Sequence, residues 1–218
     1  MRLRIAGINH NDILGANRLH AWYEHVRKLE KSTPTFVAVE FDRELFEQLR
    51  LQRPLIRRLA SEAWPETNDE VLCVVEGSLV YEGDLHERVF PGVETVWLDQ
   101  GRSITDPMEI SDYAENRLSI YKKSTSTTKL KLEIGDVEII CRAAWKNQRV
   151  PPKRDGSCRD RKFSQKITQR VANCKSDWAI VVVGSNHASP IEGSMVSLLT
   201  DQGIACHVTE LRPYHADL

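Results

Sequence analysis

The segment Trp178-Ala-Ile-Val-Val-Val-Gly-Ser-Asn-His187 decides the fold of this chain. Its apolar run, Ala179–Val183, is short, continuous and rich in β-branched residues, which is typical of a strand covered on both faces in a parallel sheet. Gly184 suits the turn that ends such a strand, because a residue without a Cβ makes tight turns easily. His187 then follows the carboxyl end of the strand, where open α/β sheets bind their ligands.

The segment Leu3-Arg-Ile-Ala-Gly-Ile-Asn-His10 repeats this pattern near the start of the chain. Both segments run from apolar residues into Gly-x-Asn-His. A single histidine after a strand is more often a solvated or buried structural residue than a ligand or catalyst. The same Gly-x-Asn-His motif occurs after two predicted strands, and this repetition favours a functional role for His10 and His187.

Predicted strands and helices alternate along most of the remaining chain. We expect further strands at 35–40, 94–99 and 205–211, a hairpin at 129–140, an exposed connection at 148–156, and helices at 12–31, from 42 onward with a break at Pro54, and at 69–85, 107–123, 159–173 and 190–202. This alternation predicts an α/β fold with a largely parallel, mixed sheet flanked by helices. The sequence offers no convincing linker, so we predict a single domain over residues 1–218.

Composition narrows the classes of partner. Thirty Lys and Arg residues nearly balance 31 Asp and Glu residues, so bulk charge indicates neither a nucleic acid nor an anionic membrane. The sequence lacks an apolar run of about 20 residues that would span a bilayer, and it starts without the apolar core of a signal peptide. We therefore expect a cytoplasmic protein.

The five cysteines show no C-x-x-C pairing, which predicts neither a disulfide framework nor a structural zinc site. Several specific sites are also excluded. The chain has no G-x-S-x-G elbow, no Walker loop and no dinucleotide fingerprint. Aromatic residues are too sparsely interleaved with Lys and Arg to predict a surface for single-stranded nucleic acid.

Several of the predicted strands finish on polar residues. His10 and His187 lie just beyond the glycine turns, and Glu40, Asp99 and Glu210 lie at the ends of their strands. Because parallel strands share one carboxyl edge, these side chains are expected to converge there. Imidazole and carboxylate groups serve general acid–base catalysis and bind divalent metals. Glu40 and Asp99 also have a structural interpretation, since an acidic residue stabilises the start of a following helix. Glu210 is interpreted as structural.

The motifs Gly7-Ile-Asn-His10, Val39-Glu40 and Val182-Val-Gly-Ser-Asn-His187 occur in this order, and Gly193, Leu198-Leu199 and Gly203 follow them. Together they resemble the TraB/Tiki/erythromycin-esterase/ChaN-like superfamily. The segment Arg159-Asp160-Arg161 is similar to the Arg-Asp element of that superfamily, although Cys158 stands where a glutamate often precedes it. The resemblance covers both ends of the chain and includes the middle only through Trp97-Leu-Asp99.

The resemblance implies an erythromycin-esterase/ChaN-like fold and a hydrolase acting on a small molecule or a peptide. His10, Glu40 and His187 would bind a divalent ion, with manganese, cobalt or zinc as candidates, or would activate water directly as bases. Arg159 would stabilise the oxyanion that forms when water attacks.

Two non-catalytic functions are alternatives. The chain could be a binding or regulatory protein that keeps the pocket for haem or another small ligand, as a haem-binding member of the superfamily implies. It could also be an interaction subunit that contacts a partner protein through its charged 142–170 region, although such a region is more often solvated surface. The sequence does not set the oligomeric state.

Overall fold

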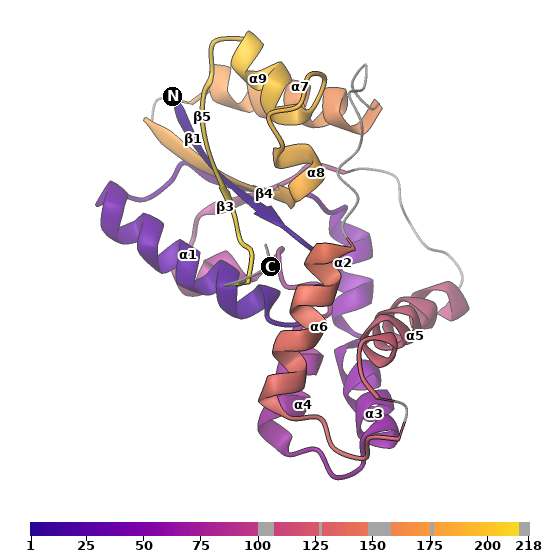
Figure 1. The fold of residues 1–218 in the computed structure, drawn as a ribbon. Helices are drawn as coiled ribbons and strands as arrows, with labels where there is room; N and C mark the ends of the chain where they lie inside the picture. The colour runs from indigo at the N-terminus through magenta and orange to yellow at the C-terminus, as the bar shows by residue number, and fades with distance from the viewer. Residues whose placement is uncertain (100–106, 127, 148–157, 175–176, 214–218) are drawn as a thin grey trace.

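Five parallel strands form one sheet in the computed structural model, which describes residues 1–99, 107–126, 128–147, 158–174 and 177–213 (Figure 1). The strands are β1 (Arg2–Ile8), β2 (Phe36–Val39), β3 (Glu94–Trp97), β4 (Trp178–Gly184) and β5 (Ala205–Glu210). Their order across the sheet is β3-β2-β4-β1-β5. The predicted α/β fold is confirmed.

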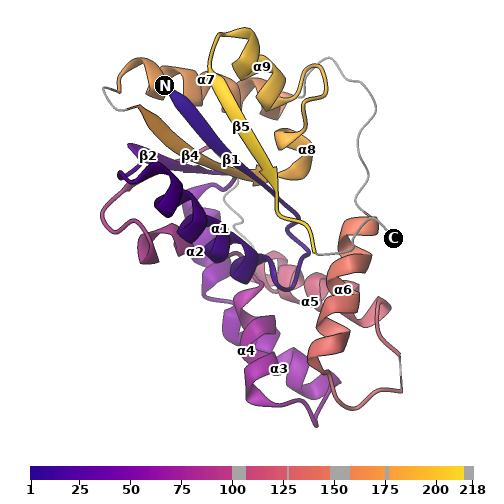
Figure 2. The ribbon, with the colours of Figure 1, turned by 60° about the vertical axis from the view of Figure 1, so that its left-hand side comes forward.

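The helices divide into two layers on the sheet and a separate helical extension (Figures 1 and 2). They are α1 (Gly15–Glu30), α2 (Arg43–Arg50), α3 (Arg53–Ala63), α4 (Asp69–Gly77), the 3-10 helix η1 (Leu85–Arg88), α5 (Pro107–Lys123), α6 (Ile134–Lys146), α7 (Cys158–Ala172), α8 (Ser185–Ala188) and α9 (Met195–Asp201). Helices α7 to α9 cover one face of the sheet and α1 covers the other, while α3 to α6 extend away from the sheet.

Strand β4 lies at the centre of the sheet, between β2 and β1, and all seven of its residues are buried. Alternate residues of β1 belong to opposite layers. Leu3 and Ile5 pack in the cluster that contains residues of α7 and α9, whereas Ala6 and Ile8 pack with α1. The continuous apolar run of β4 therefore reflects burial on both faces of the sheet, as predicted.

The predicted hairpin at 129–140 is wrong, because this region leads into helix α6. Val137, Ile140 and Cys141 are fully buried at helical spacing. The Glu133 backbone N–H donates to the Asp136 carboxylate at 2.8 Å, which stabilises the first turn. The Gly135-Asp136 pair, which predicts a hairpin turn in the sequence, thus lies inside the first turn of a helix.

Other boundaries shift by a few residues. Helix α9 begins at Met195 rather than at 190, because the Ser194 hydroxyl caps it by accepting from the Ser197 N–H at 3.1 Å. Gly203 has a φ of +77°, consistent with its predicted place just after the helix. The predicted connection at 148–156 lies outside the described residues.

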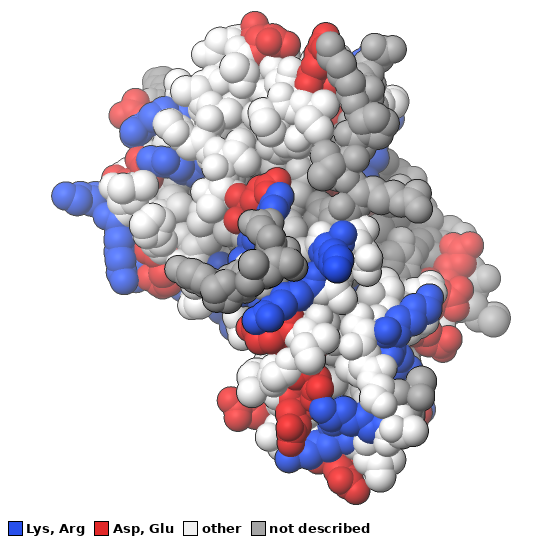
Figure 3. Space-filling view, in the orientation of Figure 1, with Lys and Arg blue, Asp and Glu red and all other residues white. Residues whose placement is uncertain are grey.

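The surface and the cysteines agree with the composition. On the face shown in Figure 3, basic and acidic side chains are interspersed. All five cysteines are unpaired. Within the part of the chain that the structure describes, no helix is both long enough and apolar enough to cross a membrane.

Asp12 connects the helical extension to the sheet. Its carboxylate is 1% exposed and lies in the loop between β1 and α1. It accepts hydrogen bonds from Trp145 Nε1 of α6 at 2.9 Å and from Arg18 Nε at 3.0 Å. The Leu14 backbone N–H donates to it as well, at 3.0 Å. One buried carboxylate thereby joins α6 to the start of α1 and to the loop that carries His10.

Substituting Asp12→Ala is expected to lower the free energy of unfolding by about 3 kcal/mol, because it leaves a guanidinium and an indole N–H without their acceptor. Urea unfolding followed by circular dichroism measures this loss. Asp201→Ala, which removes an exposed carboxylate at the end of α9, is the control and should change stability by no more than about 0.5 kcal/mol. Equal losses in the two variants would contradict this role of Asp12.

Candidate active site

His10, Glu40 and His187 meet at the carboxyl edge of the sheet. His10 follows β1, Glu40 follows β2 directly, and His187 lies in α8, which begins where β4 ends. These three strands are neighbours in the order β2-β4-β1, and all run parallel. The structure therefore brings together the three residues that the sequence predicts as the site.

The carboxylate of Glu40 lies between the two imidazoles. His10 Nε2 is 3.6 Å from Oε2, and His187 Nε2 is 3.4 Å from Oε1. The Gly184 backbone N–H donates to Oε2 at 2.5 Å. Because the Glu40 side chain is only 7% exposed, these contacts take the place of water around a buried charge.

A second carboxylate holds each imidazole from its other side. His10 Nδ1 is 2.7 Å from Glu82 Oε1, and His187 Nδ1 is 2.7 Å from Asp160 Oδ1. Both carboxylates are buried and anchored by the backbone. The Tyr81 N–H donates to Glu82 at 2.9 Å, and the Met195 N–H donates to Asp160 at 2.9 Å. Each ring is thus fixed with its Nε2 directed toward Glu40.

Sequence reasoning did not identify these two outer carboxylates as site residues. Asp160 had a signal, since it lies in the Arg159-Asp160-Arg161 segment that resembles the superfamily element. No sequence feature indicated Glu82 as a site residue, because it lies in the segment 69–85, which the sequence predicts to be one helix. That helix in fact ends at Gly77.

Arg159 bridges two acidic residues of the site. Its Nη2 atom is 3.1 Å from Glu40 Oε1 and 2.6 Å from Asp99 Oδ2, and its guanidinium lies over the Phe163 ring. Asp99 follows β3 and so joins the same edge, as predicted. Glu210, at the end of β5, instead pairs with Arg212 at 2.6 Å.

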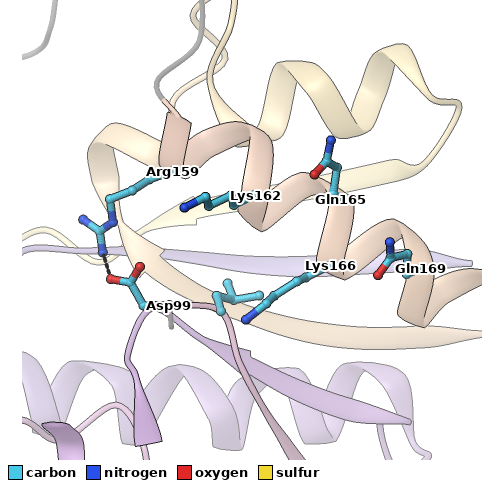
Figure 4. Close-up of a pocket in the computed structure, with 7 residues that line it drawn as sticks. Asp99, Arg159, Lys162, Gln165, Lys166 and Gln169 are labelled. Carbon is cyan, nitrogen blue, oxygen red and sulfur yellow. Dashed lines mark hydrogen bonds and ion pairs between the residues drawn. The ribbon is translucent and has the colours of Figure 1, made fainter. Parts of the chain in front are cut away.

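A polar groove continues from Arg159 along α7. Figure 4 shows Lys162, Gln165, Lys166 and Gln169 following Arg159 on this helix. The groove has a volume of about 240 Å³. Lys166 Nζ donates to the Trp97 carbonyl at 3.1 Å, so this lysine is fastened to the end of β3.

The charges of the site shift the pKa values of its groups. Burial is the largest influence on both imidazoles and lowers the pKa, but hydrogen bonds and charges outweigh it. Glu40 and Glu82 raise the pKa of His10 to about 10, and Asp160 and Glu40 raise the pKa of His187 to about 9. Burial favours the neutral form of Glu40, yet the two imidazoles hold its pKa well below the ordinary value. At neutral pH the site is an imidazolium–carboxylate–imidazolium array.

A pocket of about 220 Å³ opens onto one side of this array. His10, Glu40 and Arg159 line it, together with an apolar wall built from Phe41, Leu45, Leu49, Leu79 and Val80. The His10 side chain is 35% exposed, whereas that of His187 is 11% exposed and packs against the Phe163 ring. His10 is therefore placed to meet a ligand, and His187 is placed to orient Glu40 from behind.

Val80 holds an unusual backbone conformation at the wall of this pocket. Its φ is +47°, which is strained for a β-branched residue. Arg53 secures the turn, since its guanidinium donates to the Leu79 and Val80 carbonyls. Strain of this kind concentrates at functional sites, and here it occurs two residues before Glu82.

No family model, curated protein or solved structure matches this chain. The resemblance of its motifs to the TraB/Tiki/erythromycin-esterase/ChaN-like superfamily therefore stays a prediction. A functional assignment depends on the geometry of the edge that carries His10, Glu40 and His187.

The raised imidazole pKa values predict a loss of stability at high pH. A histidine whose pKa is higher in the folded than in the unfolded chain stabilises the fold below about pH 6.5, and this contribution disappears as pH rises through the folded pKa. We expect the free energy of unfolding to fall by on the order of 2 kcal/mol between about pH 7 and about pH 10. Urea unfolding across this range should show a shallower fall for His187→Gln. The same fall in the variant would contradict the assignment.

Substituting Gly184→Ala is expected to disturb the site without unfolding the protein. The new Cβ would lie 3.2 Å from both Glu40 Oε2 and His10 Nε2, while the backbone φ of −56° suits alanine. Displacing Glu40 removes a cause of the raised His10 pKa, so the His10 imidazole should titrate at lower pH, as followed by NMR. Gly77→Ala, where a Cβ meets open space, should leave the titration as in the wild type. Identical titration curves in all three proteins would contradict this effect.

Proposed function

We propose that this chain is a hydrolase that activates water at His10, Glu40 and His187 for attack on a carbonyl group. The observation that carries this proposal is the buried Glu40 carboxylate, flanked by two imidazoles that are each backed by a further carboxylate. The position of these groups at the carboxyl edge of a parallel sheet, beside a pocket, supports it further. A small molecule or a peptide is the proposed substrate.

The charges of Glu40 and His10 at rest indicate which residue accepts a proton and which donates one. Glu40 accepts a proton from water as the water oxygen bonds to the carbonyl carbon. Because the neighbouring imidazolium groups make Glu40 a weak base, this transfer is proposed to coincide with the loss of the His10 proton. His10, protonated at rest, gives its proton to the leaving group as the bond to that group breaks. The proton held by Glu40 then returns to His10, which restores the starting state.

Arg159 and His187 assist this sequence without exchanging protons with the substrate. Arg159 lines the pocket and carries a positive charge close to Glu40. We propose that it stabilises the oxyanion formed when the water attacks. His187 is a positioning residue, because it holds Oε1 of Glu40 and is not among the residues that line the pocket.

A divalent ion is the second way in which the same residues could activate water. Two imidazole Nε2 atoms and one carboxylate suit zinc, manganese or cobalt, and carboxylates that hold the outer nitrogens are typical of metal-binding histidines. When bound, such an ion would lower the pKa of water. Among the described residues, however, no group of three such side chains is already arranged to hold a metal. Both imidazoles would first have to release a proton.

The size of the pocket favours a small substrate over haem. Its volume of about 220 Å³ is below the roughly 300 Å³ at which pockets begin to enclose drug-sized ligands. Haem is a larger molecule than such ligands, so the pocket as it stands gives the haem-binding alternative no support.

Glu40→Gln and His10→Asn are each expected to lower kcat/KM by about 100-fold or more, the usual contribution of a general acid or base. The measurement uses a panel of chromogenic esters and amides with protein purified without a histidine tag. Glu62→Gln, which neutralises an exposed carboxylate on α3, is the matched control and should keep full activity. Full activity in both site variants, or no hydrolysis of any panel member by the wild type, would overturn the proposal.

The role of a metal is measured in the same assay. Protein treated with a chelator and dialysed is compared with protein supplied with zinc, manganese or cobalt. Unchanged activity after chelation indicates direct water activation by Glu40 and His10, and restoration by one ion indicates the metal-dependent route.

A further inference from the structure

Arg117 of α5 lines the same pocket as His10 and Glu40. Its Nη1 atom is shielded from solvent, yet it has no hydrogen-bond partner in the described parts of the chain. Leaving a buried guanidinium nitrogen without an acceptor is costly, and native structures usually explain such a group by a water, an ion or a function. Arg117 also forms no ion pair with any described residue, so an anionic ligand in the pocket that it lines would supply its counter-charge.

Buried hydrogen bonds fasten the helix that carries this guanidinium. Burial raises the pKa of the Tyr121 hydroxyl, and the nearby Arg117 guanidinium opposes this rise. Tyr121 Oη donates to Ser78 Oγ at 2.8 Å, and Ser78 Oγ donates to the Val75 carbonyl at 2.6 Å. Tyr121 and Ser78 are both fully buried. These contacts tie α5, the helix of Arg117, to the end of α4 before any ligand arrives.

The acidic residues of the pocket wall are already occupied elsewhere. Glu40 contacts two imidazoles and Arg159, and Asp99 pairs with Arg159. The Asp42 carboxylate caps α2 by accepting from two backbone N–H groups. A ligand that brings its own acceptor is therefore the natural partner of Arg117.

We propose that Arg117 binds a carboxylate of the substrate, so that the enzyme acts on short esters or amides whose acyl group ends in a carboxylate. This inference rests on the proposed hydrolase function. A guanidinium fork matches a carboxylate in geometry and charge. The three acidic side chains of the wall repel a phosphate dianion more than a monoanion, which favours the carboxylate. Leu45, Leu49 and Leu79 provide an apolar wall for a short carbon chain.

The test compares two esters that differ only at the end of the acyl chain. These are mono-para-nitrophenyl glutarate, which ends in a carboxylate, and para-nitrophenyl pentanoate, which ends in a methyl group. We expect the wild type to prefer the glutarate ester in kcat/KM. In Arg117→Gln the glutarate-to-pentanoate ratio should fall roughly 10- to 100-fold, the usual effect of losing a charged hydrogen bond.

Two further variants separate charge from geometry. Arg117→Lys keeps the charge but loses the fork, so its ratio should lie between those of the wild type and Arg117→Gln. Arg58→Gln removes one positive charge from an exposed side chain of α3 and should leave the ratio as in the wild type. Circular dichroism confirms that each variant is folded.

A binding measurement distinguishes failure of this inference from failure of the proposed function. Isothermal titration with glutarate should detect binding to the wild type that weakens by at least about tenfold in Arg117→Gln, and inorganic phosphate should bind more weakly than glutarate. Hydrolysis of both esters with an equal ratio in wild type and Arg117→Gln would overturn the inference and leave the hydrolase proposal standing. Arg117-dependent glutarate binding without hydrolysis of either ester would overturn the function and keep the carboxylate site. Tighter binding of phosphate would overturn the choice of carboxylate.

Discussion

The edge of the sheet is organised by the burial of one charge, the carboxylate of Glu40. A buried carboxylate is costly unless cations and hydrogen-bond donors replace its water. Here His10, His187, Arg159 and the Gly184 N–H do so. Because the two imidazoles then become cationic as well, each needs a further carboxylate, and Glu82 and Asp160 supply these charges. The other charges of the network therefore depend on the burial of this one carboxylate.

The order of the strands makes this network attainable. Glu40 follows β2 and His10 follows β1, and β4, which leads to His187, lies between these two strands. Parallel strands share one carboxyl edge, so three residues remote in sequence arrive at adjacent positions. Gly184 leaves room at the centre of the edge, because a Cβ there would approach Glu40 Oε2 and His10 Nε2 to 3.2 Å. The apolar run of β4 and the glycine after it therefore serve the fold and the site together.

The residues that could be predicted from sequence are those placed by the strands themselves. His10, Glu40 and His187 lie at or just beyond the ends of predicted strands, so the position of a strand end was enough to group them. Glu82 reaches the site from the loop after α4 and Arg117 reaches it from α5, and no local pattern specifies how these segments pack. The hairpin predicted at 129–140 was wrong for a related reason. The alternating polar and apolar residues before α6 belong to the segment that leads into this helix. The buried face of α6 is defined only by the elements that pack against it.

Charge pairing also indicates where the resting site is incomplete. Each carboxylate of the edge contacts a cation or a backbone donor, and the buried ones are held by more than one such group. Because the groups of this array already neutralise one another's charges, they have little tendency to bind a charged ligand. Arg117 differs, because it lines the pocket while its Nη1 lacks an acceptor among the described residues. A ligand anion would therefore gain most at Arg117, and the apolar side chains of the same pocket would contact the carbon chain attached to that anion.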